Sequence, residues 1–558
     1  MVVHFCRKIT RKALAATTAL SGSKHGTRAA LILIAALFVA TRISLLPVSL
    51  ERDEGEYAFM ASQFLDGHAP FSNAYNMKLP GVALTYAAFF AIAGKTIEAA
   101  HLALLFVDIL TLGFFYLILV RLGIRSHIRL PALFFLALLL TGWRSLGFAA
   151  HATHFILGFF MPGLWLMLFR GSTWKLAASG LLMGFAFLCK QQAVFLLATS
   201  GLALIVLSWK NSRSLVSVIR ECCVFGFSAL VPLAVIIAWA FAAGSIETMK
   251  FWTVDYANAY TSLTSLQDAV ITFSSGIGRV AGDNLPLWLI AIPGLFFILR
   301  SLRREKDGTG AILFVLGVGA FLTVVPGYYF RPHYFVTMLP FVALCGAWGV
   351  SSVATMFAKA AKTLHVPFIA ALALSAVFVV YPVAYTVNYC FLYTNEQLHA
   401  RAYGTHLFVS SVSMAEKIRE LTPRHDSVGN LTCDPQIMFY ADRRSASGYL
   451  YMYSLMEDHK YAESMQRELI QEIESNRPAT LVYIPRPWDR TPKSRELVFT
   501  WLEGYLTNYC LEHIFEVNRF ATHLYHPLIT PLSSVSNRHA VWGFVFAKKQ
   551  PPRKGKNI

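Results

Sequence analysis

The sequence predicts a membrane-embedded all-α bundle of about eleven transmembrane helices, followed by a soluble α/β domain. Of the 558 residues, 56% are hydrophobic and only 14% are charged, and the mean hydropathy is +0.50. Soluble domains carry about 25% charged residues. Apolar runs long enough to cross ~30 Å of hydrocarbon recur up to about residue 390. Each such run must satisfy its own backbone hydrogen bonds in lipid, so we expect helices.

The first apolar run, 29–48, follows a basic N-terminal segment. It is long for a signal-peptide core and has no clear small-x-small cleavage site, so we expect an uncleaved span. The predicted spans are 29–48, 99–120, 130–143, 154–169, 176–189, 192–208, 222–243, 284–299, 309–325, 334–350 and 366–386.

The distribution of positive charge predicts the orientation of these spans. With the N-terminus in the cytoplasm, the inner segments hold about twenty Lys and Arg, and the longer outer loops about eight. We therefore expect a cytoplasmic segment 1–28, a transmembrane module 29–387 in the inner (plasma) membrane, and an extracytoplasmic domain 388–558. Topology then explains the net charge of +18. We find no nucleic-acid-binding motif and expect no nucleic-acid partner.

The first outer loop, 49–98, is longer than a connector needs to be. Residues 54–65 fit an amphipathic helix with Tyr57, Met60 and Phe64 on one stripe, which predicts a helix on the membrane surface. Residues 80–94 are apolar but too short to cross the membrane, which predicts a second interfacial or half-inserted helix. We expect the loop to form a cavity wall.

The tail begins where the composition changes, near Asn388. The segment 397–430 is polar and helix-like, whereas 481–489 and 539–549 are rich in β-branched and aromatic residues and predict strands. A mixed α/β domain is the expected result. Its cysteines leave room for one disulfide, but their spacing does not demand it.

Carboxylates follow directly after the first span, in the segment RDEGEY (52–57). Charges at a membrane surface are costly to desolvate and are often functional. Paired carboxylates, here Asp53 and Glu54, can supply a general base and a neighbour that tunes it. The structural alternative is a helix start at which these carboxylates cap the first turn.

Cations at the predicted outer ends of spans suit an anionic ligand. Lys78 precedes a Pro-Gly turn, and Arg331 and His333 lie in an aromatic turn with Tyr329 between the ninth and tenth spans. A guanidinium grips phosphate through paired donors. The alternatives are a lysine anchored to lipid phosphates and an aromatic belt at the interface.

Weaker candidates lie at the outer ends of other spans: Arg144, the pair His151 and His154, and Lys190. Two histidines at i, i+3 can bind a metal, but no third ligand is indicated. We therefore predict no required cofactor and keep a divalent metal open.

Taken in order, these features resemble the polytopic GT-C glycosyltransferases. The likeness is greatest to the bacterial branch related to protein O-mannosyltransferases and to the aminoarabinose transferase of lipid A. It covers most of 29–350, and VGNLTCDPQIMFYADRRSASGYLY (428–451) resembles the start of the outer domain in that group.

The resemblance implies the roles of individual residues. Asp53, with Glu54 beside it, matches the acidic residue proposed to act as base or to orient the acceptor. Lys78 matches the lysine that contacts the donor phosphate, although Leu79 replaces the first proline of the family turn. Met77 stands where some members carry an acidic residue tied to a metal, which argues against a metal requirement.

The implied reaction moves a sugar from a polyprenyl phosphate to an envelope acceptor, with inversion. The acceptor is lipid A or lipopolysaccharide, another glycan, or protein. Arg331, Arg144 and His333 would join Lys78 at the donor phosphate, and the predicted substrate-binding residues are Tyr57, Tyr329, Lys190, His151 and His154. The main alternative is a transporter or flippase for lipid-linked sugars, which would show charged or broken helices at mid-membrane and inverted repeats. We expect neither, because the ionisable residues cluster at the outer ends of the spans. The other alternative is a non-catalytic assembly protein, which would not explain the charged residues at the outer ends of the spans.

Overall fold

The computed structural model describes residues 24–169, 171–282, 284–301, 309–360, 380–404, 407–484, 496–516 and 541–549. The chain forms two compact units. Unit 1 comprises Met1–Pro47, His101–Val235 and Thr264–Tyr393, and unit 2 comprises Val48–Ala100, Ile236–Leu263 and Thr394–Ile558. The first outer loop therefore folds with the C-terminal residues, whereas the sequence-based division grouped it with the spans.

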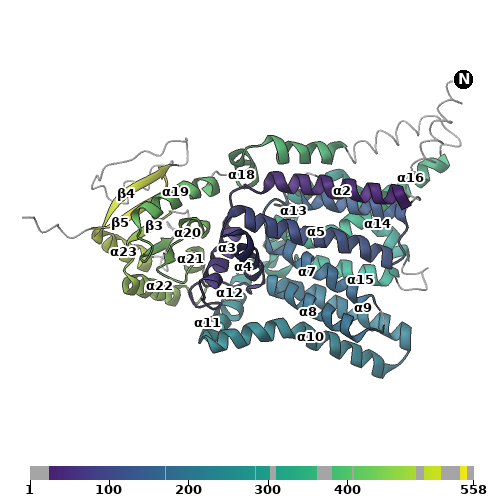
Figure 1. Cartoon of the computed structure of the whole chain (residues 1–558), viewed down its shortest axis with the longest axis horizontal. Coiled ribbons are helices and arrows are strands. Elements are labelled where there is room, and N and C mark those ends of the chain that lie inside the picture. The colour runs from purple at the N-terminus through teal and green to yellow at the C-terminus, as the bar shows by residue number, and fades with distance from the viewer. Residues whose placement is uncertain are drawn as a thin grey trace, which may run out of the picture. The chain divides into compact units, whose positions relative to one another are not determined.

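Unit 1 is a bundle of α-helices, of which α14 packs along α16 and α7 along α8 (Figure 1). Helices α5 and α10 each belong in part to unit 2. The α-helices are α2 Lys24–Leu45, α5 Ile97–Arg121, α6 Ser126–Leu140, α7 Ala152–Met167, α8 Thr173–Cys189, α9 Val194–Ser212, α10 Leu215–Ala242, α13 Leu266–Gly282, α14 Leu285–Ser301, α15 Thr309–Leu322 and α16 Leu339–Ala360. Shorter helical turns are η1 Gln191–Ala193, η3 Pro326–Tyr328, η4 Pro332–Met338 and η5 Asn388–Leu392.

Each of the first ten predicted spans overlaps one of these helices, with ends that differ by up to ten residues. The eleventh, 366–386, lies mostly outside the described residues. Within the described part of the chain, five helices are long and apolar enough to cross a membrane, and the bent pair of α13 and α14 would make a sixth. Helices α6, α7, α8 and α15 are apolar but have only 14–17 residues, about 21–26 Å at 1.5 Å per residue. The predicted crossings at these four helices would therefore need flanking residues to complete them.

Small residues allow the helices of unit 1 to approach closely. A Cβ at Gly294 of α14 would lie 1.8 Å from the Cys345 carbonyl oxygen of α16, and one at Gly349 would lie 1.8 Å from the Ile290 carbonyl oxygen. Lipid tails provide no hydrophobic driving force between helices, so close van der Waals packing through small residues holds such interfaces together.

Unit 2 is a mixed α/β fold built from three separate stretches of chain. Its sheet has the strand order β2-β1-β3-β5-β4, with β1 parallel to β2 and β3, and β5 antiparallel to β3 and β4. The strands are β1 Ser427–Leu431, β2 Arg444–Ser445, β3 Thr480–Tyr483, β4 Tyr509–Glu516 and β5 Val541–Lys548. The helices are α3 Arg52–Leu65, α4 Gly81–Ala93, α11 Ile246–Lys250, η2 Phe251–Tyr256, α12 Ala257–Thr261, α18 Asn395–Tyr403, α19 Leu407–Leu421, α20 Gln436–Ala441, α21 Tyr453–Met456, α22 Ala462–Asn476, α23 Glu496–Tyr505 and η7 Leu506–Asn508.

The predictions for the tail are mostly confirmed where the structure describes them. Strands β3 and β5 overlap the two segments predicted as strands, and α18 and α19 fill most of 397–430. The helix-like prediction is wrong at the end of that segment, where 427–430 belong to strand β1. Residues 485–489 and 539–540 of the predicted strands lie outside the described residues. Cys433 and Cys510 are not joined by a disulfide.

Helix α3 is not the surface helix that its amphipathic pattern predicted. Every residue from Glu54 to Gln63 is buried, because α4 and α20 pack against it. The approach of α20 is so close that a Cβ at Gly55 would lie 2.4 Å from Gln436. Sequence periodicity reports the apolar face of a helix, but it does not reveal a second cover supplied by chain almost 400 residues away. Helix α4 is likewise buried along much of its length.

We expect Gly294→Val to destabilise the bundle, because the side chain has no space at the α14–α16 contact and overpacking costs about 1–3 kcal/mol. The midpoint of thermal unfolding of the detergent-purified protein measures this. Gly113→Val in α5 is the matched control, since a Cβ there meets nothing within 4 Å. Equal midpoints for the two variants would contradict the close packing.

Candidate functional site

The central feature of unit 2 is a lysine held by two carboxylates. The Lys78 Nζ atom lies 3.3 Å from Asp53 Oδ1 and 3.2 Å from Glu56 Oε2. Asp53 and Glu56 are three residues apart on α3, so their side chains project from the same face of the helix. Their exposure differs: the side chains of Asp53 and Lys78 are 18% and 14% exposed, and that of Glu56 is 1% exposed. A ligand can therefore reach the lysine and Asp53 but not Glu56.

Glu54, predicted as the partner of Asp53, has a different role in this structure. Its Oε2 accepts a hydrogen bond from the Glu51 backbone N–H at 3.0 Å, and Glu51 Oε1 accepts one from the Glu54 N–H at 3.1 Å. This reciprocal capping box satisfies two backbone donors at the start of α3. The structural alternative weighed for this segment is thus realised by Glu51 and Glu54. The carboxylate that shares Lys78 with Asp53 is Glu56, which the sequence-based assignment missed and which i, i+3 spacing from Asp53 would have identified.

Both oxygens of Glu56 accept hydrogen bonds from neutral donors. The Tyr451 hydroxyl donates to Oε2 and the Asn76 side-chain amide donates to Oε1. Burial raises the pKa of the Glu56 carboxyl, while the Lys78 charge and these two hydrogen bonds act in the opposite direction. Burial is the largest of these effects and the Asp53 charge adds to it, so the pKa of Glu56 is raised overall. Lys78, Tyr451 and Asn76 limit the increase.

The environment of Lys78 favours its charged form. Burial alone would lower the pKa of its ammonium group, but the charges of Asp53 and Glu56 outweigh burial and raise that pKa well above its usual value. The Nζ atom also lies 4.8 Å from the centre of the Tyr57 ring, within the range of a cation–π interaction. Tyr57, predicted to bind substrate, therefore contacts the predicted phosphate-binding lysine directly.

The loop that carries Lys78 is attached to the C-terminal stretch of unit 2. The Tyr75 backbone N–H donates to the Gly448 carbonyl at 2.7 Å, and the Tyr75 hydroxyl donates to Glu472 Oε1 at 2.6 Å. Asn76 Oδ1 accepts from the Lys78 backbone N–H at 2.9 Å. These contacts fix the backbone on which the lysine projects.

In unit 1, three predicted residues from remote segments gather around one tyrosine. The His151 and His333 rings are stacked with centroids 4.0 Å apart and planes 8° apart. The His333 ring meets Tyr334 edge-on at 4.9 Å, and Lys190 Nζ lies 3.6 Å from the Tyr334 ring centre. His151 precedes α7, Lys190 separates α8 from η1, and His333 lies in η4. The sequence named these residues without indicating that they meet.

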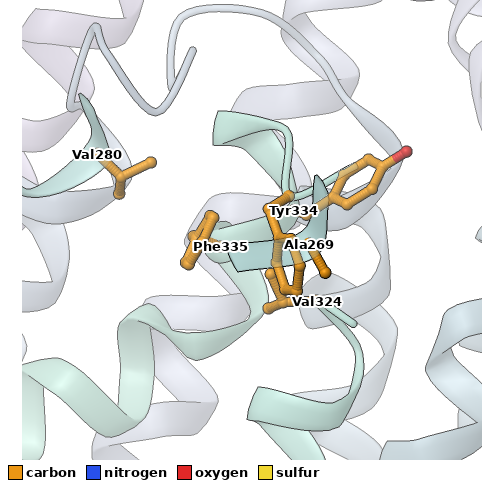
Figure 2. Close-up of a cluster of buried hydrophobic side chains, with 6 residues drawn as sticks. Ala269, Val280, Val324, Tyr334 and Phe335 are labelled. Carbon is orange, nitrogen blue, oxygen red and sulfur yellow. The ribbon is translucent and has the colours of Figure 1, made fainter. Parts of the chain in front are cut away.

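The turn before η4 is held by an apolar cluster of Ala269, Val280, Val324, Phe330, Tyr334 and Phe335 (Figure 2). In Figure 2 the Tyr334 hydroxyl points away from the other labelled side chains. The backbone enters the left-handed region at Gly327, Tyr328 and Phe330, with φ of 75°, 56° and 43°. Such conformations cost energy for residues other than glycine. Contacts with the surrounding side chains must therefore stabilise this turn.

The predicted phosphate-binding arginines lie beside aromatic rings. The Arg331 guanidinium is exposed, and its Cζ lies 5.3 Å from the Tyr329 ring centre. The Arg144 Cζ lies 5.3 Å from the Trp143 ring centre, and its guanidinium occupies the space in which Gly282 would carry a Cβ. Arg331 is therefore the more accessible of the two predicted contacts.

His154, predicted to bind substrate, belongs to a buried ionic network instead. Its Nδ1 lies 2.8 Å from Asp108 Oδ1, and the other oxygen of Asp108 is paired with Arg42. Arg42 also donates to the carbonyls of Leu140 and Gly147. The three side chains are only 0–2% exposed and join α2, α5 and α7. The signal for Arg42 and Asp108 was present in the sequence, as charges inside apolar runs.

No family model and no curated protein sequence matches the chain. Among solved structures, ArnT from Cupriavidus metallidurans bound to undecaprenyl phosphate is similar with a TM-score of 0.56 and 16% identity, covering 93% of this chain and 97% of that chain. An oligosaccharyltransferase from Archaeoglobus fulgidus, tethered to an acceptor peptide, is similar with a TM-score of 0.50 and 13% identity. That match covers 91% of this chain and 74% of the archaeal one.

These similarities confirm the predicted fold class. The chain has the fold of the GT-C membrane glycosyltransferases over nearly its whole length, with apolar helices in the bundle and a small sheet in the C-terminal region. A fold alone does not assign an activity, which must be argued from the site.

We expect Asp108→Ala to lower the free energy of unfolding by about 3–5 kcal/mol, because it leaves the Arg42 charge buried without its counter-ion. Asp66→Ala is the control: this carboxylate pairs with Lys95 at 2.8 Å but is 50% exposed, and exposed pairs contribute about 1 kcal/mol or less. Chemical unfolding in detergent, followed by tryptophan fluorescence, compares the variants. A small effect at Asp108, similar to that at Asp66, would show that the network does not stabilise the bundle.

Proposed function

We propose that this protein is an inverting membrane glycosyltransferase that moves a sugar from a polyprenyl-phosphate donor to an envelope acceptor. The acceptor is lipid A or lipopolysaccharide, another glycan, or protein. The observation that carries the proposal is the Lys78 ammonium between Asp53 and Glu56, because it places a partly accessible cation directly beside a partly accessible carboxylate. The cation can stabilise the anionic leaving group, and the carboxylate can accept the proton of the attacking hydroxyl. Both reactants meet at the anomeric carbon, so the two groups must lie next to each other.

The reaction is a single displacement at the anomeric carbon. The oxygen of the acceptor hydroxyl forms a bond to the anomeric carbon, and Asp53 accepts the proton of that hydroxyl. The bond between the carbon and the phosphate oxygen breaks, and the electron pair leaves with polyprenyl phosphate. Lys78 stabilises the negative charge on that phosphate. Attack from the side opposite the leaving group inverts the anomeric centre.

The solved structures of the same fold support the class of donor. One holds undecaprenyl phosphate, and an archaeal oligosaccharyltransferase with a TM-score of 0.50 and 12% identity was solved with dolichol phosphate. Both ligands are long lipids ending in a phosphate. We propose a lipid donor of the same kind for this chain, with the reaction on the outer face of the inner membrane, the N-terminus in the cytoplasm and the C-terminal domain outside.

The transporter alternative predicts charged groups inside the spans, and Arg42, Asp108 and His154 are such groups. Their burial argues against a transport role, because a pathway residue must meet its substrate or water and these side chains are only 0–2% exposed. The accessible charges belong instead to Asp53 and Lys78.

We expect Asp53→Asn to lower the rate of polyprenyl phosphate release by about 10²-fold or more, the contribution of a positioned general base. The purified protein is incubated with a panel of polyprenyl-phosphate sugars and an envelope lipid extract, and release is measured by mass spectrometry. Asp66→Asn, which changes an exposed carboxylate of the same unit, should retain the wild-type rate. Near-normal turnover by Asp53→Asn would exclude the base assignment.

The same assay run with a chelator tests the metal requirement. Because both carboxylates already face the Lys78 cation, a divalent ion would have to compete with it, and we expect release to continue in EDTA. Loss of release that Mn²⁺ or Mg²⁺ restores would show that a metal takes part. If no donor releases polyprenyl phosphate although the protein is folded, a flipping assay tests the transporter alternative.

A further inference from the structure

We propose that Tyr451, from the C-terminal stretch of unit 2, is a positioning residue for sugar transfer that acts through Glu56 on Lys78. The inference rests on the proposed function, but part of its test does not depend on turnover. It assigns to the C-terminal stretch a direct part in organising the charged site.

The geometry makes Tyr451 the link between the C-terminal stretch and the lysine. Its hydroxyl donates to Glu56 Oε2, the same oxygen that lies 3.2 Å from Lys78 Nζ. The other oxygen of Glu56 accepts a hydrogen bond from Asn76. Hydrogen bonds to both oxygens therefore fix the orientation of the carboxylate. The Tyr451 hydroxyl also lies 3.4 Å from the Arg52 carbonyl oxygen at the start of α3.

Burial separates the role of Glu56 from that of Asp53. With 1% of its side chain exposed, Glu56 does not reach a substrate and acts only on its neighbours. A buried carboxylate loses most of its solvation and needs donors to remain ionised. Tyr451 is itself buried, with 7% exposure, and supplies one of these donors. Without it the Glu56 proton is held more tightly, and Lys78 loses part of the counter-charge that places its ammonium.

Hydrogen bonds to the backbone anchor the chain around Tyr451. The Met452 N–H donates to the Thr432 carbonyl at 2.9 Å, and the Ser454 hydroxyl donates to the Tyr451 carbonyl at 2.9 Å. Two residues earlier, Tyr449 pairs with Tyr75 in a β-bridge, beside Asn76 of the lysine loop. The C-terminal stretch therefore aligns both the lysine loop and the carboxylate on α3.

Tyr449 supplies a matched control. Its ring is 1% exposed, and its hydroxyl donates to Glu468 at 2.7 Å. Tyr451→Phe and Tyr449→Phe each remove one hydroxyl–carboxylate hydrogen bond from unit 2 and keep the ring. The carboxylate is buried in the first case and exposed in the second, because Glu468 lies at the surface. Only the first removes a contact to Glu56.

In the release assay, we expect Tyr451→Phe to raise the KM for the polyprenyl-phosphate sugar about tenfold, the loss typical of a hydrogen bond to a charged group. The acidic limb of kcat/KM should move to higher pH, because Glu56 then titrates at higher pH. Tyr449→Phe should change neither. Equal losses in both variants, or a fall in kcat with no change in KM or in the pH profile, would reduce Tyr451 to a structural contact and overturn the proposal.

Chemical labelling of Lys78 tests the linkage without any substrate. The purified protein is treated with an amine-reactive acetylating reagent between pH 7 and 10, and the labelling rate of Lys78 is followed by mass spectrometry. Tyr451→Phe should accelerate labelling at a given pH, by about tenfold for each unit by which the Lys78 pKa falls. Tyr449→Phe should behave as the wild type. Unchanged labelling in Tyr451→Phe would refute the linkage, whereas a wild type that releases no polyprenyl phosphate would refute the proposed function alone.

Discussion

The charged site depends on one constraint: a lysine ammonium must stay ionised in a place that is largely closed to water. Lys78 meets this constraint with two carboxylates, the partly accessible Asp53 and the buried Glu56. Glu56 in turn requires hydrogen-bond donors, since an unpaired buried carboxylate would take up a proton. Asn76 and Tyr451 provide them. The lysine can then offer its positive charge to a phosphate while Asp53 remains available to an acceptor.

This constraint explains why unit 2 is assembled from stretches far apart in the chain. Helix α3 carries the two carboxylates, the following loop carries the lysine, and the C-terminal stretch carries the tyrosine that supports Glu56. Tight packing holds these segments in position, as the close approach of Gly55 to Gln436 illustrates. Unit 1 solves a separate problem, because close helix packing and the network of Arg42, Asp108 and His154 stabilise a bundle that gains little from the hydrophobic effect in lipid.

Much of this architecture was predictable, because hydropathy and charge asymmetry are strong local signals. Hydropathy located ten helices, and β-branched and aromatic residues located the strands β3 and β5. Charge asymmetry predicts only the orientation of the spans. Asp53 and Lys78 were also identified from the sequence, and the structure brings them together. Glu54 and Glu56 had local signals that the prediction missed: a capping box with Glu51, and i, i+3 spacing from Asp53. His154 shows where local pattern fails, because its partner Asp108 comes from another helix. The burial of α3 has the same origin, since its cover comes from α20.

The most direct test of the account compares the binding of undecaprenyl phosphate and undecaprenol to the wild type and to Lys78→Met, which removes the charge and shortens the side chain by one atom. The account predicts that the wild type binds the phosphate at least about tenfold more tightly than the alcohol, because a charge-assisted hydrogen bond is lost with the phosphate. It also predicts that Lys78→Met abolishes this difference while binding the alcohol normally. A variant that still prefers the phosphate as strongly as the wild type would contradict the role of Lys78.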